Sequence, residues 1–198
     1  MLLFGHLGVT LGAALLVDGA VTKYRSQKKQ VSSEDTSASA PELGKAVYDR
    51  YLLDLRLLLV GSLLPDLIDK PVGMLILSDV FQNGRIFAHT LLFFVLLLSL
   101  GIYLYQRRGR NWLLMLSLGD LSHIVLDSMW AVPQTLFWPL FGWAFPRVAG
   151  DWSSIARGLL TNPAVYVSEL IGLFVVGWVA FTLLRSHRVR FFVRNGRL

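Results

Sequence analysis

Five apolar stretches, each close to the length that crosses a lipid bilayer, constrain the fold of this 198-residue chain more than any other feature. A transmembrane helix needs about 20 mostly apolar residues, with roughly 17 as the practical minimum. Hydrophobic residues make up 54% of the chain and charged residues only 16%, against about 25% charged residues in a soluble domain. We therefore expect an all-α, polytopic membrane bundle of about five spans, forming a single membrane domain. The predicted spans are residues 2–17, 52–69, 89–105, 112–130 and 163–184.

Two of the connecting segments have distinctive compositions. Residues 18–51 are rich in Ser, Lys, Gln and Glu and cannot bury a core, so we expect a polar cytoplasmic loop there. Residues 131–162 alternate Trp with Pro and Phe, and such aromatic residues prefer the membrane–water boundary. We expect this second segment to lie along the outer surface. Within the first span, Gly8 and Gly12 have the spacing that permits close contact between helices.

Lys and Arg are distributed very unequally between the two sides of such a bundle. Fifteen of the 19 lie in the polar loop, in the 107–110 turn, in the carboxyl-terminal tail or at Arg56. Cytoplasmic loops of membrane proteins carry the excess of positive charge, so we place these segments in the cytoplasm. The net charge of +6 then needs no nucleic-acid partner. The four remaining basic residues are Lys70, Arg85, Arg147 and Arg157.

In this orientation, most ionisable residues of the spans fall at the outer, extracytoplasmic face. Asp120, His123 and Asp127 also share one side of the fourth span, because they stand at i, i+3 and i+7. Asp and His inside a span are costly unless they are paired or coordinated. The outer-face residues are His6, Asp66, Asp69, His89, Asp127 and Glu169.

A divalent cation would satisfy these groups together. The chain has no cysteine, so nitrogen and oxygen must bind any metal. Histidine with carboxylate suits Zn²⁺ best, Mn²⁺ and Fe²⁺ are alternatives, and an all-carboxylate subset would accept Mg²⁺. A set of this size exceeds the needs of one tetrahedral ion and leaves room for a second ion or a general base.

Each residue also has an interpretation without a metal. An intramembrane histidine can be a hydrogen-bonded helix contact, and Asp120 can pair with Ser117 or Ser122. Asp69 can be neutralised by Lys70. Because the residues occur as a set at one face, we favour a shared site.

Four segments in this order, FGHLG, GSLLPDLID, GRIFAHT and GDLSHIVLD, resemble the family of membrane-bound metal-dependent hydrolases, also described as LexA-binding, inner-membrane-associated hydrolases. The later TLFWPLFG resembles the aromatic-proline stretch of that family. The family's usual arginine beside the third-span histidine is absent here, since Phe87 and Ala88 intervene between Arg85 and His89. The resemblance implies a location in the cytoplasmic (inner) membrane. It also implicates a set of metal ligands, together with Arg85: the predicted ligands are His6, Asp66, Asp69, His89, His123 and Asp127.

We therefore expect a metal-dependent hydrolase whose metal-activated water attacks a phosphoester or related ester of a membrane lipid or lipid-linked substrate. Asp120 would orient a ligand histidine or act as base, Arg85 would hold a phosphate, and Glu169 is a further catalytic candidate. An ion- or proton-coupled carrier is the alternative, although it needs polar groups that reach both faces. A non-catalytic scaffold with a structural metal is a third interpretation.

Overall fold

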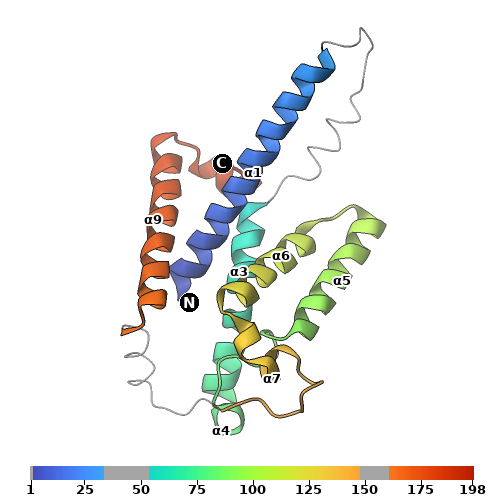
Figure 1. Cartoon of the computed structure of the whole chain (residues 1–198), viewed down its shortest axis with the longest axis vertical. Helices are drawn as coiled ribbons and strands as arrows, with labels where there is room; N and C mark the ends of the chain where they lie inside the picture. The colour runs from blue at the N-terminus through green and yellow to red at the C-terminus, as the bar shows by residue number, and fades with distance from the viewer. Residues whose placement is uncertain (1, 34–53, 148–160) are drawn as a thin grey trace.

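The computed structural model describes residues 2–33, 54–147 and 161–198, and these segments contain helices and turns but no strand (Figure 1). This confirms the all-α prediction for the described part of the chain. The five long helices are α1 (Leu3–Ser33), α3 (Leu55–Pro71), α5 (Leu91–Arg108), α6 (Trp112–Leu126) and α9 (Pro163–Arg185). The short elements are a π-helix (Val72–Ile76), α4 (Ser78–Phe81), a 3₁₀ turn (Met129–Ala131), α7 (Pro133–Leu136) and α10 (Val189–Asn195).

Three helices within the described residues are long and apolar enough to cross a membrane: Leu3–Tyr24 of α1, α5 and α9. The apolar helix α6 is shorter, with 15 residues. Helix α3 has 17 residues, and its charged side chains stand near its two ends. These three helices agree with the predicted spans 2–17, 89–105 and 163–184, whereas crossings by α3 and α6 stay a prediction.

Helix α1 is longer than the sequence analysis predicted. The expected span ended at residue 17, but the helix continues to Ser33, so the first part of the predicted polar loop is helical. Residues 18–33 contain one glycine and no proline, and Ala, Lys, Gln and Arg within them favour a helix. Local propensity therefore extends the helix past the end of its apolar part. The remainder of the predicted loop lies outside the described residues.

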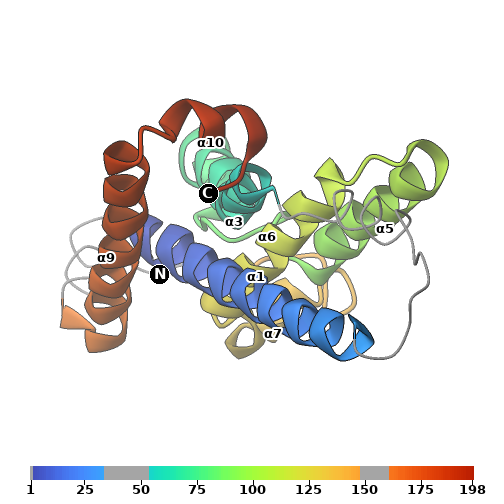
Figure 2. The same cartoon turned by 90° about the horizontal axis from the view of Figure 1, so that it is seen from above.

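Helix α3 occupies the centre of the bundle. Helices α1 and α6 pack against it, α5 packs on the far side of α6, and α9 packs on α1 (Figures 1 and 2). A buried apolar cluster joins α1, α3 and α9. Its members are Leu11, Ala14, Leu55, Leu58, Val179 and Leu183.

Glycines allow these helices to meet backbone to backbone. A Cβ at Gly119 of α6 would collide with the carbonyl oxygen of Leu58 in α3, and a Cβ at Gly8 of α1 would collide with the backbone of Gly172 in α9. The close contact predicted at Gly8 is confirmed. Gly12 is looser, since its nearest neighbour is the Val175 side chain at 3.7 Å.

We expect Gly119→Ala to lower the stability of the bundle by about 1–3 kcal/mol, the usual cost of overpacking a close contact. The added methyl group would push α6 away from α3, because backbone atoms cannot move aside as a flexible side chain can. The thermal unfolding midpoint in detergent, followed by circular dichroism, measures this effect. Gly177→Ala on α9 is the matched control, since nothing lies within 4 Å of that position. A Gly119→Ala midpoint at or above that of the control would contradict the close contact.

The described part of the predicted surface segment contains only a 3₁₀ turn, the four-residue α7 and irregular chain up to Arg147. Trp130, Phe141 and Trp143 are more than 60% exposed. Trp138 contacts Phe87 edge to face, with ring centroids 5.4 Å apart, and so joins this segment to the loop that precedes α5. Its place at the membrane–water boundary stays a prediction, and Trp152 lies outside the described residues.

Candidate metal centre

The bundle brings one end of each inner helix to the same place. The start of α1, the end of α3, the start of α5 and the end of α6 lie together in the lower half of Figure 1. His6 lies in the first turns of α1, and His89 stands directly before Thr90, whose hydroxyl caps α5. Asp127 is the C-cap residue of α6, one turn after His123. Six residues predicted as ligands are thereby brought together, and we call this group the candidate metal centre: His6, Asp66, Asp69, His89, His123 and Asp127.

The Nε2 atoms of His89 and His123 face each other at 3.2 Å, and both rings are fully buried. His89 Nδ1 lies 2.7 Å from a carboxylate oxygen of Asp69, and His123 Nδ1 lies 2.7 Å from the carbonyl oxygen of Ser62. Both of these oxygens accept hydrogen bonds, so each Nδ1 carries the ring hydrogen. When both rings are neutral, their two Nε2 lone pairs therefore point at each other.

Two facing lone pairs need a cation between them, either a metal ion or a shared proton. Two histidine nitrogens bound tetrahedrally to one Zn²⁺, at about 2.0–2.1 Å each, lie roughly 3.3–3.4 Å apart. The observed 3.2 Å is close to that separation. The arrangement also matches the usual metal-binding histidine, whose second nitrogen donates to a carboxylate or carbonyl.

Two sets of three ligand atoms lie within 4.8 Å of one another. The first triad consists of Asp66, His89 and His123, and the second triad consists of His6, His123 and Asp127. In the first, Asp66 Oδ1 lies 3.6 Å from His89 Nε2 and 3.9 Å from His123 Nε2. Both triads use His123, whose Nδ1 is bonded to Ser62, so only its Nε2 is free to bind an ion. The triads are therefore alternative places for one ion.

Asp69 belongs to neither triad. Its fully buried carboxylate accepts hydrogen bonds from the backbone N–H groups of Ile86, Ala88 and His89 at 2.8–3.1 Å, and also from His89 Nδ1. These donors compensate the loss of hydration of the buried charge. This geometry makes Asp69 the group that orients His89 and holds the 86–89 loop against α3, while its role as a metal ligand stays a prediction.

A family model that covers residues 1–191 matches this chain. The chain belongs to the YdjM inner membrane protein family. Together with the candidate spans of α1, α5 and α9, this membership makes the chain an inner-membrane protein. No curated protein and no solved structure gives a significant match. The description of the YdjM family names a location and no reaction, so the chemistry has to be argued from the site.

Two basic side chains flank the candidate metal centre of this YdjM-family protein. Arg85 Nη2 lies 2.8 Å from Asp127 Oδ2, and Lys70 Nζ lies 2.7 Å from Asp66 Oδ2. Both side chains are nearly half exposed, at 42% and 49%. Arg85 therefore reaches the site despite its distance from His89 in the sequence. Lys70 thus pairs with Asp66 and not with Asp69, as its i, i+4 spacing from Asp66 could have indicated.

His6 lies against the first triad. Its ring stacks on that of His123, with centroids 4.0 Å apart and 13° between the planes. His6 Nε2 is 3.1 Å from Asp127 Oδ1. Asp127 thus lies between His6 on one side and Arg85 on the other. The Ser62 carbonyl, which accepts the hydrogen bond of His123 Nδ1, could not be found from the sequence, since every residue has a backbone carbonyl.

The two other predicted acidic residues lie outside both triads. Asp120 is fully buried one turn before His123, and its carboxylate oxygens have no hydrogen-bond partner among the described residues. Glu169 of α9 accepts hydrogen bonds from the backbone N–H groups at positions 2, 4 and 5, at 2.7–3.0 Å. Its carboxylate therefore caps the first turn of α1, where negative charge is favourable, and helps to fix the helix that bears His6. Arg157, on the same side in the sequence analysis, lies outside the described residues.

Proposed function

We propose that this YdjM-family protein is a metal-dependent hydrolase of the membrane, with one divalent ion bound by Asp66, His89 and His123. The observation that carries the proposal is the pair of facing, buried Nε2 atoms, each with its Nδ1 already hydrogen-bonded. Two nitrogens and one carboxylate leave a fourth tetrahedral position open, as catalytic zinc sites do. When bound, such an ion supplies a water that is nucleophilic at neutral pH and polarises the ester oxygen.

The remaining side chains suit the other steps of a hydrolysis. Asp127 Oδ2 lies 3.9 Å from His123 Nε2, so when the first triad holds the ion, the Asp127 carboxylate would accept a proton from the attacking water. His6, whose Nε2 faces Asp127 Oδ1, holds that carboxylate in place. Arg85 and Lys70, both part-exposed, are placed to bind the oxygens of a phosphoester.

The distribution of polar groups favours a one-sided site over a carrier. A transport pathway needs polar groups that continue to the opposite face. Here the helices beyond the candidate metal centre pack through the buried apolar cluster of α1, α3 and α9. The open fourth position and the two exposed basic residues favour catalysis over a structural metal, since a structural site is closed by its protein ligands.

Metal-dependent turnover tests the proposal. Detergent-purified protein would be stripped with a chelator, reloaded separately with Zn²⁺, Mn²⁺ and Mg²⁺, and given phosphatidic acid and phosphatidylglycerol in mixed micelles. We expect release of phosphate, fatty acid or headgroup, detected by mass spectrometry, only from reloaded protein and not from reloaded His89→Ala. His187→Ala, in the exposed tail, should retain activity. Stoichiometric metal binding without turnover of either lipid would indicate a structural metal and contradict the hydrolase.

A further inference from the structure

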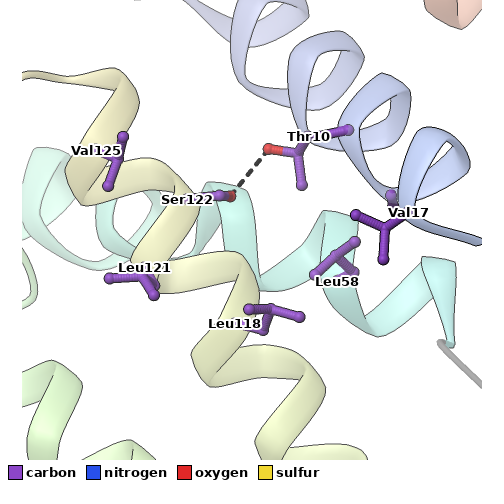
Figure 3. A pocket seen from close by; sticks show the side chains of 9 residues that line it. Thr10, Val17, Leu58, Leu118, Leu121, Ser122 and Val125 are labelled. Atoms are coloured by element: carbon purple, nitrogen blue, oxygen red, sulfur yellow. Dashed lines mark hydrogen bonds between the residues drawn. The ribbon is translucent and has the colours of Figure 1, made fainter. Parts of the chain in front are cut away.

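A hollow of about 350 Å³ lies between α1 and α6, with Leu58 of α3 at its base (Figure 3). Its volume falls within the roughly 300–1,000 Å³ typical of ligand pockets. We call it the lateral hollow. Its lining comes from residues between Thr10 and Val17 of α1, residues between Leu118 and Val125 of α6, and Leu58 of α3.

The lining is almost entirely apolar. Among the described lining residues, the hydroxyl groups are those of Thr10 and Ser122, whose oxygens lie 2.9 Å apart in a hydrogen bond with each other (Figure 3). Ser122 also donates to the carbonyl oxygen of Gly119. None of the described residues that line the hollow is charged, so this lining offers little to a polar ligand.

The lateral hollow is continuous with the outer surface of the helices. Val17, Leu118 and Val125 line it and are 53%, 42% and 49% exposed. In an inner-membrane protein, apolar surface of this kind on α1 faces lipid, because Leu3–Tyr24 is a candidate span. The hollow is thus an indentation in the protein–lipid boundary, where acyl chains are the surrounding solvent.

One end of the lateral hollow borders the candidate metal centre. Thr10 lies one turn after His6 on the same side of α1, and Ser122 directly precedes His123 in α6. From His6 to Val17, α1 advances roughly 16 Å at 1.5 Å per residue. An extended apolar chain along the hollow would therefore have its end beside the two triads.

We propose that the lateral hollow binds one acyl chain of an anionic membrane lipid and directs its ester-bearing head to the candidate metal centre. Binding of the acyl chain does not require hydrolase activity; only the reaction at the lipid head rests on the proposed function. An acyl chain fits because it needs no hydrogen bonds and enters sideways from the bilayer. Arg85 and Lys70, the basic residues beside the same end, complement a negative headgroup.

Photocrosslinking tests the occupant. The probe is phosphatidylglycerol with a diazirine at the end of one acyl chain, added at low mole fraction to the full chain in detergent. We expect adducts concentrated on residues 10–17 and 118–125, and about tenfold fewer after Ala13→Trp, which corresponds to about 1.4 kcal/mol of lost binding. Ala180→Trp is the matched control, because Ala180 is also an exposed alanine in a candidate span but lies outside the hollow.

Measuring bound metal in the same samples separates this proposal from the hydrolase. Ala13→Trp should keep the metal content, and the unmodified chain should keep its adduct pattern after chelation. Adducts spread evenly over α5, α6 and α9, or unaffected by Ala13→Trp, would overturn the acyl-chain site even if metal binds. A photoreactive residue at Leu121 that links two protein chains instead of lipid would assign the hollow to a second copy and also overturn it. If lipid adducts form in the hollow but the protein binds no metal, the acyl-chain site is supported and only the hydrolase proposal is contradicted.

Discussion

Replacing His123 by alanine is expected to lower the metal affinity of the purified protein by more than about 100-fold, because loss of an outer-shell partner alone costs roughly 10- to 100-fold. His123 is the residue that both triads share, so neither remains complete without it. The helical fold should persist, since removal of a buried polar group can offset lost coordination. Metal per protein after controlled reloading, measured by elemental analysis, and circular dichroism check both parts.

Three further variants show where the ion lies. If the first triad holds it, His89→Ala should match His123→Ala, whereas His6→Ala and Asp127→Asn should lose less metal. A larger loss in His6→Ala than in His89→Ala would contradict the first triad. His187→Ala serves as the control in the exposed tail. If a shared proton instead of a metal ion joins His89 and His123, the wild-type protein will hold no stoichiometric metal. That result would contradict the proposed metal centre.

Asp69→Asn is expected to reduce both the stability of the protein and its metal affinity. The carboxylate receives only donors, namely three backbone N–H groups and His89 Nδ1. An amide has one accepting oxygen, and its NH₂ group would face a donor, so at least one buried N–H would lose its partner. Each such loss costs about 1–3 kcal/mol. Misorientation of His89 should lower metal affinity by about 10- to 100-fold, as for other outer-shell partners.

Asp66→Asn is the matched comparison for this effect. Asp66 is part-exposed, belongs to the first triad and forms an ion pair with Lys70, which is a weak contribution to stability at an exposed position. We expect Asp66→Asn to lose metal while its thermal midpoint in metal-free detergent stays near that of wild type. Asp69→Asn should lower the metal-free midpoint clearly. Equal metal-free midpoints for the two variants would contradict the anchoring role of Asp69.

The sequence alone determined the features that depend on local rules. Apolar runs gave the membrane helices, and helical spacing placed His123 and Asp127 on one side of α6. The uneven distribution of Lys and Arg, followed through successive spans, predicted that distant His and Asp residues meet at one end, as they do in the bundle. Helix α1 continues to Ser33, past the predicted span of residues 2–17, because helix propensity extends beyond the apolar part.

Only the tertiary structure distinguished residues that look alike in the sequence. Asp66 and Asp69 stand one turn apart on α3, yet the 86–89 loop covers Asp69 with backbone donors and leaves Asp66 beside the Nε2 atoms. Glu169 became a helix cap because α9 crosses the start of α1, where Gly8 meets Gly172. The lateral hollow likewise exists because α1 and α6 both pack on α3 and leave space between them. Local spacing fixes which face of a helix a side chain occupies, but the backbone that packs against that face decides whether a carboxylate binds a metal, a histidine or a helix end.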